Sequence, residues 1–251
     1  MIDLHSHLLP GVDDGSRTAA QSARVLRSFA GKGITDVCCT PHLLASHIDQ
    51  GWPANYEAAW TRLGAEAPAQ VRLHRGAEVM LDRPIPGAAA ERRVTLGGSR
   101  YLLVEFARMV PADIVARALT EVIRCGLVPV LAHPERYSSC SIETVQAWRD
   151  LGSVIQVDAT TVTLPRRRGE RARELVFAGL ADILAADNHG DERSVATALD
   201  WLADLDAAEQ ATLLLETNPR AILDDLSTYE VDPLPVKRSV WRSMRRIFRS
   251  E

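Results

Sequence analysis

The amino-acid sequence predicts an α/β protein in which seven parallel strands close into a barrel wrapped by helices. The first observation is alternation, because apolar runs of strand length recur roughly every 30 residues with helical patterns between them. The second is composition, since these runs are nearly continuous in Val, Ile and Leu, as expected of strands covered on both faces. The third is that most runs end in a polar side chain, which a buried strand would not select for packing.

Seven apolar runs are the expected strands: residues 2–9, 34–40, 71–79, 101–106, 127–132, 154–157 and 183–186. Six segments between and after them have apolar residues at about i, i+3, i+4 and i+7, which predicts helices. They are residues 16–30, 55–65, 112–125, 142–151, 168–179 and 194–205. Glycines follow several of these segments and prolines stand near some of their starts, as helix boundaries favour. A last helical stretch covers residues 207–226.

Polar side chains stand at or just after the carboxyl ends of the expected strands. They are His5, His7, His42, Glu78, Glu105, His133, Asp158, Asp187 and His189. In a barrel, the connections that follow the strands converge around one crevice at this face. In the competing architecture, an open doubly wound sheet, the same residues would be spread along a row. The pattern therefore favours the barrel, and seven strand–helix units fit the chain better than eight.

Composition excludes several classes of protein. The chain of 251 residues suits one large domain, and its net charge of -4 gives no sign of nucleic-acid binding. The four cysteines form no C-x-x-C pair, so buried packing in a reducing compartment is the simplest interpretation. The sequence has neither the pattern of a signal peptide nor a run of roughly 18 apolar residues, so we expect a cytoplasmic protein.

We place one domain at residues 1–235 and a basic tail at residues 236–251. On a helix, the tail would present Val240, Trp241, Met244, Ile247 and Phe248 on one face and basic residues elsewhere. Such a helix can lie on an anionic membrane surface. It can equally pack on the domain or on a neighbouring subunit, so peripheral membrane contact and homo-oligomer formation both stay open.

The histidines and carboxylates of the rim predict a metal site. His5 and His7 are two residues apart on a strand, so both imidazoles point to the same face and can share one ion. A His-x-His pair alone is ambiguous, because it also occurs as a structural pair. Five of the seven histidines, however, share the predicted rim with the carboxylates, which favours several ions. Imidazole and carboxylate donors without thiolate suit Mn²⁺, Fe or Zn²⁺, and the share of oxygen suits Mn²⁺ best.

Such a cluster predicts hydrolysis of a phosphate ester. Two ions roughly 3.5–4 Å apart can bind a hydroxide between them and stabilise both the attacking and the leaving oxygen. Arg136, three residues after His133, and Arg193, four residues after His189, are placed to bind the peripheral phosphate oxygens. The alternative for each arginine is a solvated surface charge or a salt bridge to a helix.

Several segments together resemble one known family. They are the opening from Met1-Ile-Asp-Leu-His5-Ser-His7 to Asp14-Gly15, then Thr40-Pro-His42, Gly76-Ala-Glu78, His133-Pro-Glu-Arg136-Tyr137, Asp187-Asn-His189 and Thr217-Asn-Pro-Arg220. The set resembles the bacterial capsule and exopolysaccharide type of metal-dependent protein-tyrosine phosphatase, a branch of the polymerase and histidinol phosphatase (PHP) superfamily. The likeness runs from residue 1 to about residue 222. The opening and His-Pro-Glu-Arg-Tyr are specific to this branch, whereas His-x-His marks only the superfamily.

The resemblance implies the PHP fold, a distorted seven-stranded (β/α)7 barrel, with a manganese-favouring centre of up to three ions. Carried over position by position, it implies nine metal ligands: His5, His7, Asp14, His42, Glu78, Glu105, His133, Asp187 and His189. It also implies that Arg136 and Arg193 bind phosphate and that they and His42 serve catalysis. Arg193 stands one place earlier than the family pattern has its arginine, and Asp13 competes with Asp14 as the ligand.

The substrate implied by the resemblance is phosphotyrosine on a protein, namely a membrane-associated tyrosine kinase that governs capsule or exopolysaccharide synthesis. One rival is a PHP phosphatase of a small molecule such as histidinol phosphate or a nucleotide. Another is a catalytically inert, metal-binding adaptor. A cysteine-based phosphatase is excluded, because none of the four cysteines is followed by an arginine six residues later.

Four further residues have separate interpretations. Asp3 shares the strand face of His5, and we expect it to orient an imidazole through a hydrogen bond. His74 matches no motif and is interpreted as structural, whereas His47 is interpreted as a surface or substrate-contacting residue. Asp158 ends the sixth expected strand, but no motif claims it.

Overall fold

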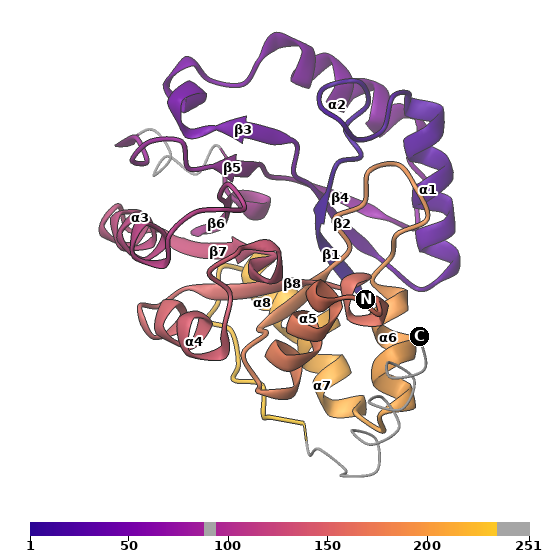
Figure 1. Ribbon diagram of the computed structural model, residues 1–251. Coiled ribbons are helices and arrows are strands. Elements are labelled where there is room, and N and C mark those ends of the chain that lie inside the picture. The colour runs from indigo at the N-terminus through magenta and orange to yellow at the C-terminus, as the bar shows by residue number, and fades with distance from the viewer. Residues whose placement is uncertain (88–93, 235–251) are drawn as a thin grey trace.

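The computed structural model describes residues 1–87 and 94–234 (Figure 1). Its strands are β1 (Ile2–Ser6), β2 (Asp36–Cys39), β3 (His42–Leu44), β4 (Arg72–Arg75), β5 (Glu78–Met80), β6 (Tyr101–Glu105), β7 (Val128–Ala132), β8 (Val154–Asp158) and β9 (Ile183–Ala185). Its α-helices are α1 (Ala19–Gly31), α2 (Ala54–Glu66), α3 (Ala112–Arg124), α4 (Ile142–Asp150), α5 (Arg167–Phe177), α6 (Ala196–Asp204), α7 (Ala208–Thr212) and α8 (Asn218–Leu223). Short 3₁₀ helices include η1 (Ala45–Gln50), η4 (Pro134–Arg136) and η5 (Thr161–Thr163).

The strands form two parallel sheets, which confirms the predicted α/β class. One sheet has the order β1-β2-β4 and the other the order β3-β5-β6-β7-β8-β9. Seven expected strands thus became nine. The strand expected at residues 71–79 is interrupted by Gly76 and Ala77, which separate β4 from β5. The strand expected at residues 34–40 contains only β2, and β3 is an additional strand that follows Thr40 and Pro41. Pro41 has no amide hydrogen to donate to a neighbouring strand. The described residues therefore form nine strands in two sheets, where the sequence predicted one sheet of seven strands.

One contact connects the two ends of the strand order. Ser6 forms a parallel bridge with Asn188, and the amide of His7 donates to the carbonyl of Asn188 at 2.7 Å. The segment after β9 therefore lies beside the end of β1. The first expected strand ends at Ser6 instead of residue 9, because the carbonyl of His7 then accepts the amide of Ser16 in a returning loop.

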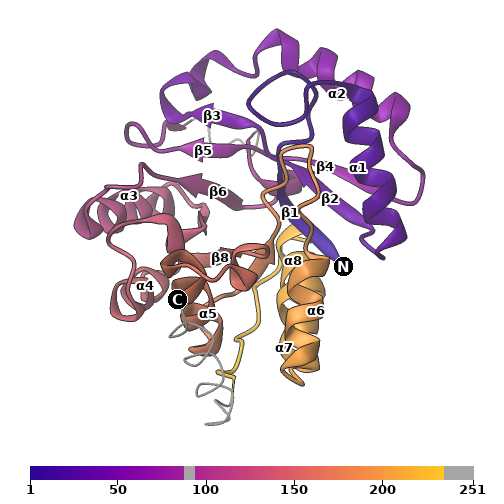
Figure 2. The same cartoon turned by 45° about the vertical axis from the view of Figure 1, so that its right-hand side comes forward.

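Apolar side chains cover both faces of the strands. On β6, Leu102 and Val104 belong to the core cluster that includes the helix residues Leu26 and Leu119. The alternate residues, Tyr101 and Leu103, belong to a second cluster built mostly from strands. This alternation follows from the two-residue period of a strand. Helices surround the strands in Figures 1 and 2, as sheets buried on both faces require.

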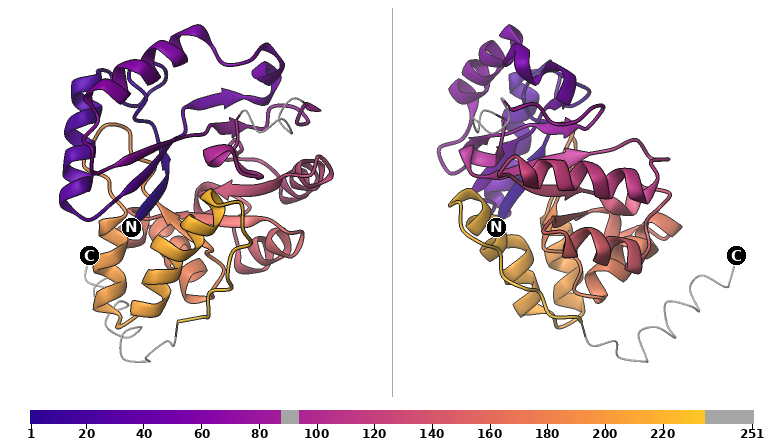
Figure 3. Two further views of the ribbon diagram at one scale, coloured as in Figure 1. Left: turned by 180° about the vertical axis from the view of Figure 1, so that it is seen from behind. Right: turned by 90° about the vertical axis from the view of Figure 1, so that its left-hand side faces the viewer.

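The last predicted helix, residues 207–226, is interrupted. A π-helical turn, Leu213–Thr217, separates α7 from α8, and Pro219 stands at the start of α8. The buried side chain of Asn218 donates to the carbonyls of Asp182 and Tyr229 and accepts the amide of Tyr229. The motif Thr217-Asn-Pro-Arg thus ties the C-terminal segment to the sheet. Figure 3, seen from behind, shows these last helices beside the N-terminal strand.

The predicted tail, residues 236–251, and the boundary placed at residue 235 lie outside the described residues. Within residues 1–87 and 94–234, no helix has the length and apolar character needed to cross a membrane.

A polar cluster at the start of β2 fixes the N-terminal sheet. The buried carboxylate of Asp36 accepts hydrogen bonds from His74 at 2.8 Å, Arg220 at 2.6 Å and Thr35 at 2.9 Å. The prediction that His74 is structural is thereby confirmed. Burial alone would raise the pKa of Asp36, but the bonds from His74 and Arg220 outweigh it and lower the pKa below its usual range.

We predict that Asp36→Asn destabilises the protein by about 1–3 kcal/mol at pH 7. A carboxyl whose pKa is lower in the folded state adds stability above its unfolded pKa, and this stability is lost as the pH falls through the folded value. The difference between the variant and the wild type should therefore shrink as the pH falls from 7 to 3. Urea unfolding at both pH values checks this, with the exposed Asp204→Asn as control. An equal loss at both pH values would contradict the ion-pair explanation.

Candidate metal centre

Four buried side chains direct one donor atom each at a common point. The Nε2 atoms of His5 and His7 are 3.2 Å apart, and each lies 3.2–3.3 Å from Glu78 Oε2 and from Asp187 Oδ1. Donors spaced by ~3.3 Å around a tetrahedron each lie ~2.0 Å from its centre, which is the bond length of a first-row transition metal to imidazole or carboxylate. The arrangement fits a cation.

Two further groups of donors adjoin this one. His42 Nδ1 lies 3.0 Å from Glu78 Oε2 and 3.2 Å from Glu105 Oε1, and His133 Nε2 lies 2.8 Å from Glu78 Oε1. At the outer side, Asp14 Oδ1 is 3.4 Å from the Nε2 atoms of both His42 and His189.

We call the nine residues of these three groups the donor cluster: His5, His7, Asp14, His42, Glu78, Glu105, His133, Asp187 and His189. The structure brings together every residue that the sequence predicted as a ligand. Glu78 contacts four histidines from three separate segments, so it lies at the centre of the cluster.

The strand ends place these side chains. His42 and Glu78 begin the paired strands β3 and β5 and stand directly opposite each other in register. Glu105 is the last residue of β6. His133 and Asp187 follow β7 and β9 in the left-handed region, with φ of 37° and 49°. Non-glycine residues adopt this conformation at a cost, and it turns both side chains into the cluster.

The imidazoles are held with one nitrogen free to bind a cation. His7 Nδ1 donates to Asp13 Oδ2 at 2.8 Å, His5 Nδ1 to Gln156 Oε1 at 3.0 Å, and His189 Nδ1 to the carbonyl of Asp187 at 2.9 Å. Each bond places a proton on Nδ1 and directs Nε2 at the other donors, where a cation can replace any second proton. This is the outer-shell support that metal-binding histidines require.

The two neighbouring aspartates have separate places. Asp13 is largely buried, orients His7 and accepts the amides of Gly15 and His42. Asp14 is exposed and directs its carboxylate toward His42 and His189. Asp14 is therefore the better placed ligand. The loop depends on Gly15, because a Cβ there would lie 2.1 Å from the carbonyl oxygen of His7.

One expectation about the surroundings of the cluster was wrong. Asp3 does not orient an imidazole; its Oδ1 accepts the backbone amides of His5 at 3.3 Å and Ala186 at 3.1 Å. The side chain that orients His5 is Gln156 of β8. Sequence reasoning missed it, although an amide within the apolar run Val154-Ile-Gln-Val157 is a polar residue that a buried strand has to pair.

Electrostatics keeps the carboxylates of Glu78 and Asp187 ionised. Burial would raise the pKa of Glu78, but the adjacent His5 and His133 hold it well below its usual range. Asp187 is likewise lowered, since the attraction of His5 outweighs burial. Burial lowers the pKa of His42, yet Glu105 and Glu78 raise it to about 10. Binding of a cation to these donors would therefore displace protons from imidazoles.

The predicted phosphate-binding arginines lie beside the cluster. Arg136 Nη2 donates to Asp158 Oδ2 at 2.9 Å and also to Asp187 Oδ2. Arg193 lies 3.7 Å from Asp187 Oδ2 and pairs with Asp191 at 2.8 Å. Asp187 thus faces the donor cluster with one oxygen and the arginines with the other. Burial lowers the pKa of Arg136, but Asp187 and Asp158 raise it further, so this guanidinium stays charged.

Arg168 and Asp158 are residues of this rim that sequence reasoning did not assign. Arg168 Nη2 lies 3.1 Å from Asp158 Oδ2, the same oxygen that Arg136 contacts. Asp158 also caps its own loop by accepting the amides of Thr160 and Thr161. Its place at the end of a strand, beside the other polar strand ends, was the available clue. His47, by contrast, lies in η1 and belongs to none of the three donor groups.

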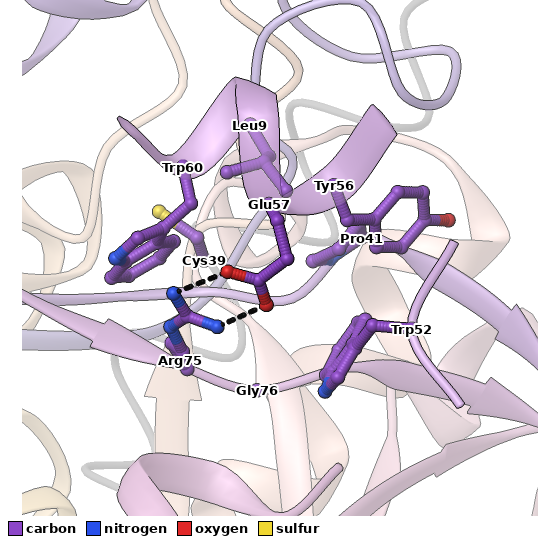
Figure 4. Close-up of a pocket in the computed structure, with 9 residues that line it drawn as sticks. All are labelled: Leu9, Cys39, Pro41, Trp52, Tyr56, Glu57, Trp60, Arg75 and Gly76. Atoms are coloured by element: carbon purple, nitrogen blue, oxygen red, sulfur yellow. Dashed lines mark hydrogen bonds and ion pairs between the residues drawn. The ribbon is translucent and has the colours of Figure 1, made fainter. Parts of the chain in front are cut away.

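A separate small hollow lies beside the site (Figure 4), and none of the donor cluster lines it. Its wall includes Trp52, Tyr56 and Trp60, with a two-bond pair between Arg75 and Glu57. The Tyr56 hydroxyl donates to the carbonyl of His42 at 2.7 Å. This aromatic wall therefore supports the backbone of a predicted ligand.

The cysteines lack the properties of nucleophiles. Cys38, Cys39 and Cys140 are buried, and burial raises the pKa of Cys39 and of Cys140 to about 12. A thiol with such a pKa carries almost no thiolate at neutral pH. The geometry agrees with the exclusion of a cysteine-based phosphatase.

Comparison with known proteins identifies the family. The family model of capsular polysaccharide synthesis proteins CpsB/CapC matches residues 1–224. The chain belongs to the CpsB/CapC family. The matched range contains every residue of the donor cluster and both predicted phosphate-binding arginines.

Two relatives within the CpsB/CapC family carry names that state an activity. Tyrosine-protein phosphatase CpsB of Streptococcus pneumoniae is 27% identical over 90% of this chain and 99% of its own length. Tyrosine-protein phosphatase YwqE of Bacillus subtilis (strain 168) is 27% identical over 95% of this chain and 97% of its own length.

The fold is also found in solved structures. A crystal structure from work on YwqE and S. pneumoniae CpsB, described as metal-dependent tyrosine phosphatases, has a TM-score of 0.79 at 24% identity and covers 95% of this chain and 100% of that one. The phosphotriesterase of Mycobacterium tuberculosis has a TM-score of 0.51 at 14% identity, with 84% and 86% covered. At these identities the likeness concerns the fold.

We predict that Gln156→Met lowers the affinity for Mn²⁺ about 10–100-fold, because His5 loses the acceptor that fixes its tautomer and ring orientation. Gln156→Glu keeps an acceptor and should bind close to wild type. Titration calorimetry with Mn²⁺ on metal-stripped protein measures both. Equal affinity of the Met variant and the wild type would show that the Gln156 bond does not support a ligand.

Proposed function

We propose that this chain is a metal-dependent protein-tyrosine phosphatase. The observation that carries the proposal is the joint placement of the donor cluster and a charged arginine on the two oxygens of Asp187. Such a site can hold cations and bind the oxygens of a phosphate monoester within one opening. The names of the CpsB/CapC relatives support the same activity.

We propose all nine residues of the donor cluster as ligands, with Mn²⁺ as the preferred metal and up to three ions bound. All nine side chains are imidazoles or carboxylates, five of them are buried, and none is a thiolate, which suits Mn²⁺ and also Fe or Zn²⁺. When bound, the ions would supply Lewis acidity at the phosphoryl oxygens and compensate the negative charge of the transition state.

The protein's own groups would orient the substrate. Arg136 is fixed by Asp158 and Asp187 and remains protonated, so its guanidinium can bind peripheral phosphate oxygens without reorganising. Arg193 is more exposed and would bind the phosphate from the connection that follows β9. His42, at 39% side-chain exposure, is the imidazole nearest to solvent in its group and we assign it a catalytic as well as a ligand role.

The exposure of the outer group favours a substrate presented by a protein. Asp14 and His42 are 67% and 39% exposed, so the cluster opens to solvent on this side. An enzyme for a small molecule would enclose it more completely. We propose phosphotyrosine of a cytoplasmic protein, namely a membrane-associated tyrosine kinase that regulates capsule or exopolysaccharide synthesis, in line with the family description.

We further propose that the nine strands are the seven strands of a distorted PHP barrel. The backbone bonds from Gly76 to Cys39 and from Glu78 to Pro41 continue the ladder across both interruptions. The Ser6–Asn188 bridge joins the first strand to the end of the last.

We predict that Mn²⁺-loaded protein hydrolyses a phosphotyrosyl peptide, that chelation abolishes this activity, and that Mn²⁺ restores it. Treatment of the folded protein with a thiol-alkylating reagent should leave activity unchanged. The assay compares phosphate release from the peptide and from histidinol phosphate. A kcat/KM that is higher for histidinol phosphate would favour a small-molecule phosphatase, and no turnover of either would exclude the enzyme.

We predict that Arg136→Lys lowers kcat/KM for phosphotyrosine about 10²–10³-fold, because lysine cannot reproduce two planar bonds to phosphate oxygens. The metal content of the variant should stay near that of the wild type, since Arg136 is no ligand. Steady-state kinetics and elemental analysis measure the two quantities. Full activity in the variant would remove Arg136 from the phosphate site.

A further inference from the structure

Arginines gather on three neighbouring connections at the mouth of the site. Arg136 follows β7 and Arg193 follows β9, and between them, after β8, Arg166 precedes α5 while Arg167 and Arg168 are its first two residues. We call Arg166–Arg168 the basic ridge. Arg166 and Arg167 are exposed, and within the described parts of the chain neither makes an ion pair.

The basic ridge is fixed next to the phosphate-binding arginine. Arg168 shares Asp158 Oδ2 with Arg136. Arg171, one turn further along α5, donates to the carbonyl of Tyr137 at 2.9 Å and so ties the helix to the connection that carries Arg136. Gly169 allows the start of α5 to pack against the loop that precedes it, because a Cβ there would lie 2.0 Å from the carbonyl oxygen of Leu164. Figure 2 shows α5 beside β8.

The local charge around the basic ridge is positive, whereas the net charge of the whole chain is negative. The net charge is -4, yet Asp158 is the acceptor that two guanidinium groups share, and the first turn of α5 has Glu170 as its acidic residue. The Nε groups of Arg136 and Arg168 are buried and have no hydrogen-bond acceptor among the described residues. Around the basic ridge, guanidinium groups and N–H donors therefore outnumber the acidic side chains of Asp158 and Glu170.

We propose that the basic ridge binds acidic side chains next to the phosphotyrosine, so that the enzyme prefers phosphotyrosines in acidic sequence. This inference rests on the proposed function and adds the class of peptide. A phosphate bound at Arg136 would bring the flanking residues of an extended peptide over the adjoining connection. Carboxylates there would pair with Arg166 and Arg167, and such pairs raise the rate of association and fix the direction of the peptide.

The test compares three substrates at low salt with Mn²⁺-loaded protein. They are a phosphotyrosyl peptide flanked by glutamates, the same peptide flanked by alanines, and p-nitrophenyl phosphate. The variant is Arg166→Gln with Arg167→Gln, which leaves Arg136 and Arg168 in place. The matched control is Arg24→Gln with Arg27→Gln, two exposed arginines on α1, which packs against α2. Both double variants change the net charge equally.

We expect the ridge variant to lose about three- to tenfold in kcat/KM on the glutamate peptide, as two exposed ion pairs allow. Its activity on the other two substrates should change less than twofold, and the control should match wild type on all three. The preference should also fall as salt rises, because screening shortens the reach of exposed charges to about 8–10 Å.

Three results would overturn the inference while leaving the phosphatase intact. They are equal rates on both peptides in the wild type, an equal loss on both in the ridge variant, and an equal loss in the control. Binding of wild type, but not of the ridge variant, to anionic lipid vesicles together with equal peptide rates would assign the ridge to a membrane. If metal-loaded wild type hydrolyses none of the three substrates, the proposed function itself fails.

Discussion

The structure depends on two buried carboxylates, Glu78 and Asp187, that have to stay ionised away from water. Burial opposes their charge, so they require positive or polarised partners on several sides. Histidines from three segments and one guanidinium supply these partners. A cation at the centre of the donors would satisfy the same requirement more strongly. The strand ends therefore converge on an arrangement that is electrostatically incomplete without bound charge.

Asp187 couples the two halves of the site. One of its oxygens lies among the donors, and the other accepts Arg136 and lies near Arg193. Binding of a cation by the donor cluster would therefore change the interaction of Asp187 with Arg136, the residue proposed to bind the phosphate. Asp158 extends this coupling outward, because it joins Arg136 to Arg168 and so to the exposed start of α5. Metal, phosphate and flanking peptide would thus be recognised by one continuous set of ion pairs.

Much of the site could be read from the sequence because of its position on the strands. A polar residue that ends an apolar run is unusual. Nine such residues on one predicted face indicated a single shared site. The side chains that orient the proposed ligands through hydrogen bonds were harder to predict. Asp3 and Gln156 both point inward from buried strands, and which of them meets the His5 imidazole depends on the register of β8 against β9 and on the path of β1. The sequence pattern of each strand does not contain that information.

The sequence by itself determined the α/β class, the order of strands and helices, and the residue types available at the strand ends, because these follow from local periodicity. Only the tertiary structure decided which donors meet. It separated Asp13 from Asp14, since the turn fixed by Gly15 directs one inward and the other to the mouth. It also divided one expected strand at Gly76, added a short strand after Pro41, and set Arg168 beside Arg136. Each of these outcomes depends on packing between segments far apart in the chain, where spacing in sequence no longer fixes distance.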